Sequence, residues 1–275
     1  MTTVDSHMHV WRAAEGPTPG VQTLVPPQTD VPIEQARAVL IANDVERAVL
    51  VQPVFRGEDS SYVAECARAE PARFAAVCVV DPRKADASHR LEHWVGRGCR
   101  GLRLRPSLPD EEPTFGAPST FHLWEAAARL DVIVSVLCRP PHLKTIGELA
   151  ELFAGVKIVI DHLGYPDPAS GVDAPPFQDL LAMARYRNIF VKLSGFYHFS
   201  DEPFPYATCW PLVRAVFDRF GPQRLLWGSD FPHCMVRGRY TASLRVIEQA
   251  LPEQGEIDRQ WIMGSTAESL YWPFG

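Results

Sequence analysis

The most restrictive feature of this sequence is a regular alternation, repeated eight times, between short apolar runs and longer segments of helical periodicity. Short runs rich in β-branched residues predict strands, and apolar residues at intervals of three and four predict amphipathic helices. Runs such as VKIVI and DVIVSVL are almost continuously apolar, which is typical of parallel strands buried on both faces. The predicted strands span residues 3–5, 48–53, 75–80, 101–104, 132–137, 157–161, 189–193 and 225–228.

Alternating strands and helices favour a parallel sheet covered by helices, and two folds of that kind compete. An open doubly wound sheet would give the same pattern, but the sequence has no Gly-rich nucleotide-binding fingerprint after its first strand. Eight strands in 275 residues favour an α/β fold with one (β/α)₈ barrel, or TIM barrel, over the whole chain, 1–275. The predicted helices span residues 33–43, 61–70, 87–97, 120–130, 143–153, 177–186, 206–220, 240–250 and 257–270.

The connections between these elements differ in length according to their direction. Turns from helix to strand are short, whereas connections from strand to helix are long and rich in Pro and Gly. Long loops are usually functional, and in a barrel they gather at the C-terminal rim. We therefore expect the active site at that rim, and we interpret residues 16–32 as a lid, a dimer contact or both. The long loops span residues 10–32, 106–119, 164–176, 195–205 and 229–239.

Charge and apolar patterning exclude several classes of protein. The net charge is -6, with Lys and Arg scattered along the chain, so the basic surface that nucleic-acid binding needs is missing. No apolar run approaches the ~18 residues of a membrane span, and the N-terminus lacks the features of a signal peptide. The six cysteines form no C-x-x-C pair and indicate reduced thiols. We expect a cytoplasmic enzyme that acts on a small molecule, and a homo-oligomer is compatible with the sequence.

Histidine and aspartate residues follow three of the predicted strands. His7 and His9 are two positions apart at the first strand end, so both side chains point to one side. His162 follows the sixth strand and Asp230 the eighth. Single residues of these types are often core polar groups or helix caps, but three imidazoles and a carboxylate at one rim suit a divalent metal such as Zn²⁺ with a bound water. The sequence therefore predicts that His7, His9, His162 and Asp230 are metal ligands and catalytic residues.

Further pocket residues are expected near the strand ends. We expect only one of Arg103 and Arg105 to face the barrel interior, and we favour Arg105 because Pro106 follows it at the rim. Its guanidinium could bind a substrate carboxylate through two hydrogen bonds, and an ion pair beneath the loop is the alternative. The remaining candidates for substrate binding are Gln52, Lys192, Ser194, Tyr197, His198 and His233.

Six motifs in this order resemble the amidohydrolase superfamily, in the branch of 2-pyrone-4,6-dicarboxylate lactonase and related sugar and muconolactone lactonases. The motifs are DSHMHV at 5–10, VQP at 51–53, GLRLR at 101–105, IDHLG at 160–164, VKLSG at 191–195 and WGSDFPH at 227–233. The resemblance implies that His7, His9 and His162 hold a metal or polarise the substrate carbonyl directly. It also implies that Asp230 is the general base that takes a proton from the attacking water.

The chain departs from the pattern of two-metal members of that superfamily. The fourth strand offers no Lys or Glu ligand, and Cys138 ends the fifth strand where those members carry a histidine. One divalent ion is therefore expected, Zn²⁺ with Mn²⁺ as the alternative. Some members of the lactonase branch work without any metal, so a metal-free mechanism stays open.

The predicted activity is hydrolysis of a lactone or similar cyclic ester of a small carboxylated substrate, by attack of water on a polarised carbonyl. A second hypothesis is decarboxylation or hydration of an unsaturated or aromatic carboxylate, because such a branch of the superfamily is similar in its H-x-H and S-D motifs. A binding scaffold without activity would not explain Asp230 beside three imidazoles. A serine esterase is disfavoured because the sequence has no G-x-S-x-G motif.

Overall fold

The centre of the molecule is one parallel eight-stranded sheet whose strands pair in chain order from β1 to β8. The computed structural model describes residues 2–13, 25, 29–106 and 114–273. A parallel bridge between Met8 and Phe231, with hydrogen bonds from His9 N to Phe231 O (2.7 Å) and from Asp230 N to His7 O (2.8 Å), joins the first and last strands. The predicted (β/α)₈ barrel is confirmed. The strands are β1 Val4–Met8, β2 Arg47–Val51, β3 Phe74–Val79, β4 Cys99–Leu104, β5 Ile133–Val136, β6 Ile158–Ile160, β7 Ile189–Leu193 and β8 Leu225–Trp227.

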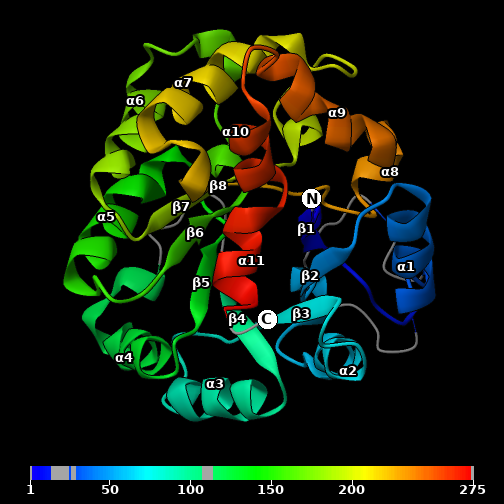
Figure 1. Ribbon diagram of the computed structural model, residues 1–275. Helices are drawn as coiled ribbons and strands as arrows, with labels where there is room; N and C mark the ends of the chain where they lie inside the picture. The colour runs from blue at the N-terminus through cyan, green and yellow to red at the C-terminus, as the bar shows by residue number, and fades with distance from the viewer. Residues whose placement is uncertain (1, 14–24, 26–28, 107–113, 274–275) are drawn as a thin grey trace.

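The helices surround the strands and cover the outside of the barrel (Figure 1). Most lie where the apolar periodicity predicts them, within a few residues at each end. None of the helices in the described part of the chain is long and apolar enough to cross a membrane. The helices are α1 Ile33–Ala42, α2 Ser61–Ala69, α3 Ala87–Gly96, α4 Phe121–Arg129, α5 Leu143–Leu152, α6 Pro175–Ala182, α7 Trp210–Phe220, α8 Cys234–Arg237, α9 Tyr240–Ala250, α10 Glu256–Gln260 and α11 Thr266–Tyr271.

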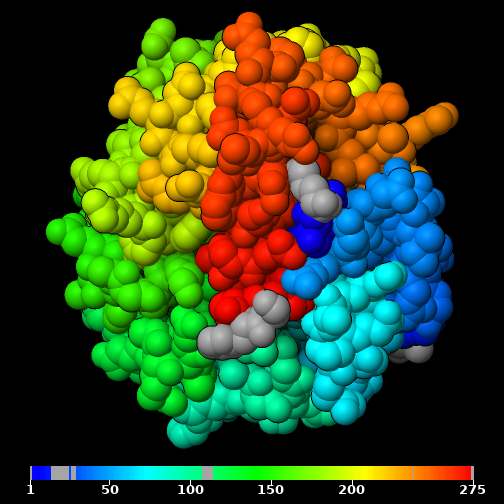
Figure 2. All heavy atoms as spheres, in the orientation of Figure 1, coloured from blue at the N-terminus to red at the C-terminus, as the bar shows by residue number. Residues whose placement is uncertain are grey.

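The C-terminal segment crosses the end of the barrel at which β1 begins, and its spheres cover the centre of that face (Figures 1 and 2). The single helix predicted over 257–270 is instead interrupted between α10 and α11 by a π-helical turn, Trp261–Ser265. A Cβ atom at Gly264 would collide with the carbonyl oxygen of Thr2. Gly264 therefore lets this segment pass directly against the start of β1. With this end covered, the opposite end carries the long loops.

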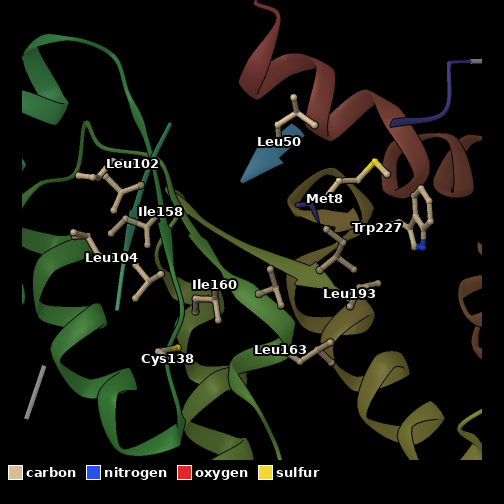
Figure 3. Close-up of a cluster of buried hydrophobic side chains, with 14 of the residues drawn as sticks. Met8, Leu50, Leu102, Leu104, Cys138, Ile158, Ile160, Leu163, Leu193 and Trp227 are labelled. Atoms are coloured by element: carbon tan, nitrogen blue, oxygen red, sulfur yellow. The ribbon is translucent and has the colours of Figure 1, made fainter. Parts of the chain in front are cut away.

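Alternation along the strands separates two apolar clusters. Leu102 and Leu104 of β4 and Ile158 and Ile160 of β6 point outward and pack beneath the helices (Figure 3). An inner cluster fills the N-terminal half of the barrel and is closed by residues of α11. Above this cluster, toward the C-terminal ends of the strands, the interior becomes polar. The inner cluster comprises Val4, Val49, Val51, Ala75, Val77, Ile133, Val159, Leu226, Ala267, Leu270 and Tyr271.

Candidate active site

Three of the predicted ligands lie together at the C-terminal end of the barrel. His7 and His9, at the end of β1, are buried, and their Nε2 atoms are 3.2 Å apart. Asp230, in the loop after β8, places Oδ1 3.1 Å from Nε2 of His9 and 3.6 Å from Nε2 of His7. Residues from the two ends of the chain therefore meet because β1 and β8 are neighbours in the closed barrel.

The three atoms form a triangle that matches one face of a tetrahedral zinc site. Two ligand atoms that each lie 2.0–2.1 Å from a tetrahedral ion are separated by about 3.3 Å, close to the observed 3.1, 3.2 and 3.6 Å. Nδ1 of His9 lies 2.7 Å from the carbonyl oxygen of Val51. A carbonyl oxygen can only accept, so Nδ1 of a neutral His9 carries the proton and Nε2 presents its lone pair to Asp230. Two such electron-rich atoms repel unless a cation lies between them. The donor set therefore fits a divalent metal ion.

His162 follows β6 in an unusual backbone conformation. Four consecutive residues have positive φ, namely His162 (51°), Leu163 (52°), Gly164 (70°) and Tyr165 (54°). Non-glycine residues in this region cost of order 1–3 kcal/mol each, and they cluster at functional sites. The turn directs both His162 and Tyr165 into the same cavity.

The imidazole of His162 is held from β7 and from the loop that follows. Its Nδ1 lies 2.8 Å from Oγ of Ser194, and a Cβ atom at Gly195 would lie only 2.6 Å from the same nitrogen. Burial is the main reason that its pKa falls to about 3, so the ring is neutral. Ligand atoms of His162, His198 and Asp230 also lie within 4.8 Å of one another. His162 therefore belongs to a second group that shares Asp230 with the first.

The second oxygen of Asp230 accepts two hydrogen bonds from the loop after β7. Tyr197 donates its hydroxyl to Oδ2, and Nε2 of His198 lies 3.0 Å from the same oxygen. Burial alone would raise the pKa of Asp230, but the surrounding imidazoles, first that of His162 and then those of His198 and His9, hold it well below its ordinary value. Burial and the adjacent carboxylate raise the pKa of Tyr197, which stays a phenol. Asp230 is thus an ionised, oriented carboxylate.

A layer of buried charges lies beneath His7. Asp161 places Oδ1 3.0 Å from Nζ of Lys192 and 3.5 Å from Nδ1 of His7, while Oδ2 lies 3.2 Å from Nε of Arg103. Burial raises the pKa of Asp161, but the ammonium group of Lys192, the adjacent His7 imidazole and the Arg103 guanidinium outweigh it, and the net shift is far downward. Burial and the Lys192 charge lower the pKa of His7, which is therefore neutral. The layer joins β1, β4, β6 and β7 directly below the candidate metal ligands.

A cavity of about 280 Å³ opens above these groups. Its lining combines imidazoles, the Asp230 carboxylate and the Arg103 guanidinium with apolar and aromatic side chains. This combination suits a small polar molecule with one ring face to pack. The lining residues are His9, Pro53, Val54, Phe55, Arg103, Leu137, His162, Tyr165, His198, Asp230 and His233.

Comparison with known proteins establishes the family of this chain. The family model for amidohydrolases matches residues 4–272. This chain belongs to the amidohydrolase family. The resemblance inferred from the six motifs is confirmed, and the protein is a hydrolase.

Relatives of this amidohydrolase include two curated enzymes that are 30% identical to it. One is the L-fucono-1,5-lactonase of Burkholderia ambifaria, aligned over 86% of this chain and 82% of that protein. The other is the 4-sulfomuconolactone hydrolase of Rhizobium radiobacter, aligned over 83% and 75%. A solved amidohydrolase of Burkholderia multivorans with bound zinc superposes with a TM-score of 0.85 over 99% of both chains at 24% identity. That superposition shows the shared fold.

In this amidohydrolase the preference for Arg105 over Arg103 is wrong. Side chains two positions apart along a strand point to the same side, and because Leu102 and Leu104 point outward, Arg103 points inward. β4 ends at Leu104, so Arg105 lies beyond the strand, half-buried, with Asp81 and the Arg83 guanidinium among its charged neighbours. Arg103 is the guanidinium that lines the cavity.

The other predicted substrate-binding residues separate into two groups. His198 and His233 line the cavity, and burial lowers the pKa of His233 to about 4. The others do not line it: Gln52 donates its amide to the carbonyl oxygens of Gly57 (3.4 Å) and Asp59 (2.7 Å). Lys192 lies beneath His7, Ser194 behind His162, and Tyr197 behind Asp230.

Several residues of the site in this amidohydrolase, in the cavity lining or in the charged layer beneath it, were missed by the sequence analysis. Asp161 could have been recognised, because it is a carboxylate at the end of an apolar strand and directly precedes His162. Phe55, Leu137 and Tyr165 lie in rim loops, where an apolar side chain carries no periodic signal. The predicted lid or dimer contact at 16–32 falls almost entirely outside the described residues.

Proposed function

We propose that this amidohydrolase is a metal-dependent lactonase that opens the ring of a small carboxylated lactone by attack of water on the carbonyl. The observation that carries the proposal is the buried, ionised carboxylate of Asp230, whose Oδ1 lies 3.1 and 3.6 Å from Nε2 of His9 and His7. The cavity of about 280 Å³ lies at the small end of ligand pockets and suits a single-ring substrate. The lactone-directed names of two relatives support this substrate class.

The residues divide the chemistry as follows. His7, His9 and Asp230 hold the metal, for which we propose Zn²⁺ with Mn²⁺ as the alternative, and His162 adds a neutral imidazole beside the reacting carbonyl. When bound, the ion supplies polarisation of the carbonyl and a lowered pKa of the attacking water. Asp230, which Tyr197 and His198 hold in position, takes the proton of that water.

Recognition of the substrate is assigned to the remaining lining groups. Nε of Arg103 is engaged by Asp161, which leaves its terminal nitrogens for a substrate carboxylate or the developing oxyanion. Phe55 and Tyr165 contribute aromatic rings to the cavity lining, against which the flat ring packs. His198 and His233 lie at the cavity wall and provide polar contacts to the ring substituents.

The test is a panel of lactones with acid release followed in a weakly buffered indicator assay. We expect ring opening of at least one carboxylated lactone, loss of that activity in Asp230→Asn, and about one divalent ion per chain by elemental analysis. Carbon dioxide release from aromatic acids, with no acid release from any lactone, would instead favour the decarboxylase hypothesis.

We further infer that the enzyme is cytoplasmic and that its chain forms one barrel domain. The six cysteines are all free and buried, which is typical of reducing compartments. Fractionation of the native host, with a periplasmic marker as control, tests the location.

A further inference from the structure

The charged layer beneath His7 is more elaborate than the proposed hydrolysis requires. The side chains of Asp161 and Lys192 are fully buried, and that of Arg103 is 4% exposed. Such charges are expensive to remove from water, and none of the three is a candidate metal ligand. Two of them contact His7 on the edge of its ring that faces away from the metal site.

The two contacts favour opposite positions of the proton on the neutral His7 imidazole. Nζ of Lys192 lies 3.2 Å from Nδ1 of His7, and Oδ1 of Asp161 lies 3.5 Å from the same nitrogen. If Nδ1 accepts a hydrogen bond from Lys192, the proton of the neutral ring is on Nε2, which then has no lone pair for a metal. If Nδ1 carries the proton and donates it to Asp161, the lone pair of Nε2 is free.

We propose that Lys192 and Asp161 are positioning residues that set the metal affinity of this site in opposite directions, Lys192 weakening it and Asp161 strengthening it. The inference rests on the proposed function in one respect, namely that the metal binds to His7, His9 and Asp230. Asp161 favours the metal-binding tautomer of His7, as carboxylates behind ligating histidines do in general. Lys192 favours the other tautomer.

The charge of Lys192 acts in the same direction as its hydrogen bond. Its ammonium group is one imidazole ring away from the ligand atoms, and water does not screen it because both Lys192 and His7 are fully buried. A dication at the site is repelled by this group. Asp161 offsets part of that repulsion, but it is shared with Arg103 through its other oxygen. The consequence is a site that holds its metal weakly and exchanges it.

The experiment measures metal affinity rather than activity. Purified full-length protein is freed of metal with dipicolinate, and Zn²⁺ affinity is determined by competition with a chromogenic chelator, with Co²⁺ absorption as a second readout. We expect Lys192→Met to bind Zn²⁺ about tenfold more tightly or better, and Asp161→Asn to bind it about 10- to 100-fold more weakly. A merely structural ion pair would weaken binding in both variants, so the opposite signs are the diagnostic result.

The controls separate the inference from the proposed function. Lys157→Met removes the lysine of an exposed pair with Asp131 (3.2 Å) and should leave Zn²⁺ affinity unchanged. If Lys192→Met does not fold, Lys192→Gln removes the charge while keeping a donor to Asp161, and it should also bind more tightly. Equal or weaker binding by the Lys192 variants, or unweakened binding by Asp161→Asn, overturns the inference alone. Absence of Zn²⁺ binding by wild type and Lys192 variants alike overturns both the inference and the metal part of the proposed function.

Discussion

Replacement of Asp230 by asparagine should lower the activity and, in metal-free protein, raise the thermal stability. Both effects follow from the hydrogen bonds around this carboxylate. Oδ2 of Asp230 accepts from Tyr197 and lies 3.0 Å from Nε2 of His198, while Oδ1 faces Nε2 of His9 at 3.1 Å. The carbonyl of Val51 fixes the proton of neutral His9 on its other nitrogen. An asparagine can keep its oxygen toward Tyr197 and His198 and turn its amide nitrogen toward His9, where it donates to the lone pair.

The expected magnitudes follow from these contacts. Loss of the general base costs about 10²- to 10⁴-fold in kcat, which corresponds to about 3–5 kcal/mol of transition-state stabilisation. In metal-free protein the same change replaces a repulsive contact by a hydrogen bond of about 0.5–1.5 kcal/mol. For a chain of this size, 1 kcal/mol corresponds to roughly 2–4 °C in Tm. We therefore expect metal-free Asp230→Asn to melt about 1–6 °C above metal-free wild type.

Two assays on one preparation check this prediction. Lactone hydrolysis is measured as kcat on the best substrate of the panel, and thermal unfolding of dipicolinate-treated protein is followed by circular dichroism. An Asp230→Asn enzyme that retains more than about a tenth of the wild-type kcat would refute the role of the carboxylate as base. A metal-free Tm below that of wild type would refute the assigned tautomer of His9 and, with it, the argument that a cation belongs between these atoms.

Three further outcomes are expected. Arg103→Met should raise KM for a carboxylated lactone by about 10- to 100-fold, because a charge-assisted hydrogen bond contributes roughly 1.5–3 kcal/mol. The control Arg105→Met should change KM less than about threefold. Equal effects of the two substitutions would contradict the assignment of Arg103 to the cavity. Gly195→Ala should lower kcat at least about tenfold and destabilise the fold by about 1–3 kcal/mol, because φ is 65° and the new Cβ would press on His162. The control Gly155→Ala has no atom within 4 Å of its Cβ position and should leave both kcat and stability unchanged. Chelation should abolish lactone hydrolysis and stoichiometric Zn²⁺ should restore it; full activity in metal-free protein would establish the metal-independent alternative.

The sequence predicts the barrel well because its evidence is local and repeated. Each strand is a short apolar run, each helix has its own period, and eight copies of the pair leave few alternatives. The meeting of His7, His9 and Asp230 follows from the same evidence, since residues at the C-terminal ends of parallel strands share one rim. The error at Arg105 arose at the boundary of β4, where a period of two assigns a side but does not say where the strand ends.

The remainder of the site depends on conformation that no periodic pattern encodes. His162 and Tyr165 reach the cavity through consecutive left-handed residues, of which only one is glycine. Such a turn is stable only because the surrounding structure enforces it, so the local sequence does not announce it. Phe55 likewise lines the cavity from a short 3₁₀ turn, Val54–Arg56. Their contribution becomes visible only when the closed barrel brings the loops after β2 and β6 to the same rim.

The charged layer is also hard to explain by the stability of the barrel alone. The barrel interior below it is filled by residues such as Val77 and Val159, which shows that this fold can close its core with apolar side chains alone. Replacing a buried ion network by well-packed apolar residues is often neutral or stabilising. Asp161, Lys192 and Arg103 are therefore hard to explain as stabilisers of the barrel. Their burial is explained if they set the tautomer of His7 and thereby the metal affinity of the site. The metal titration of the Lys192 and Asp161 variants tests this explanation.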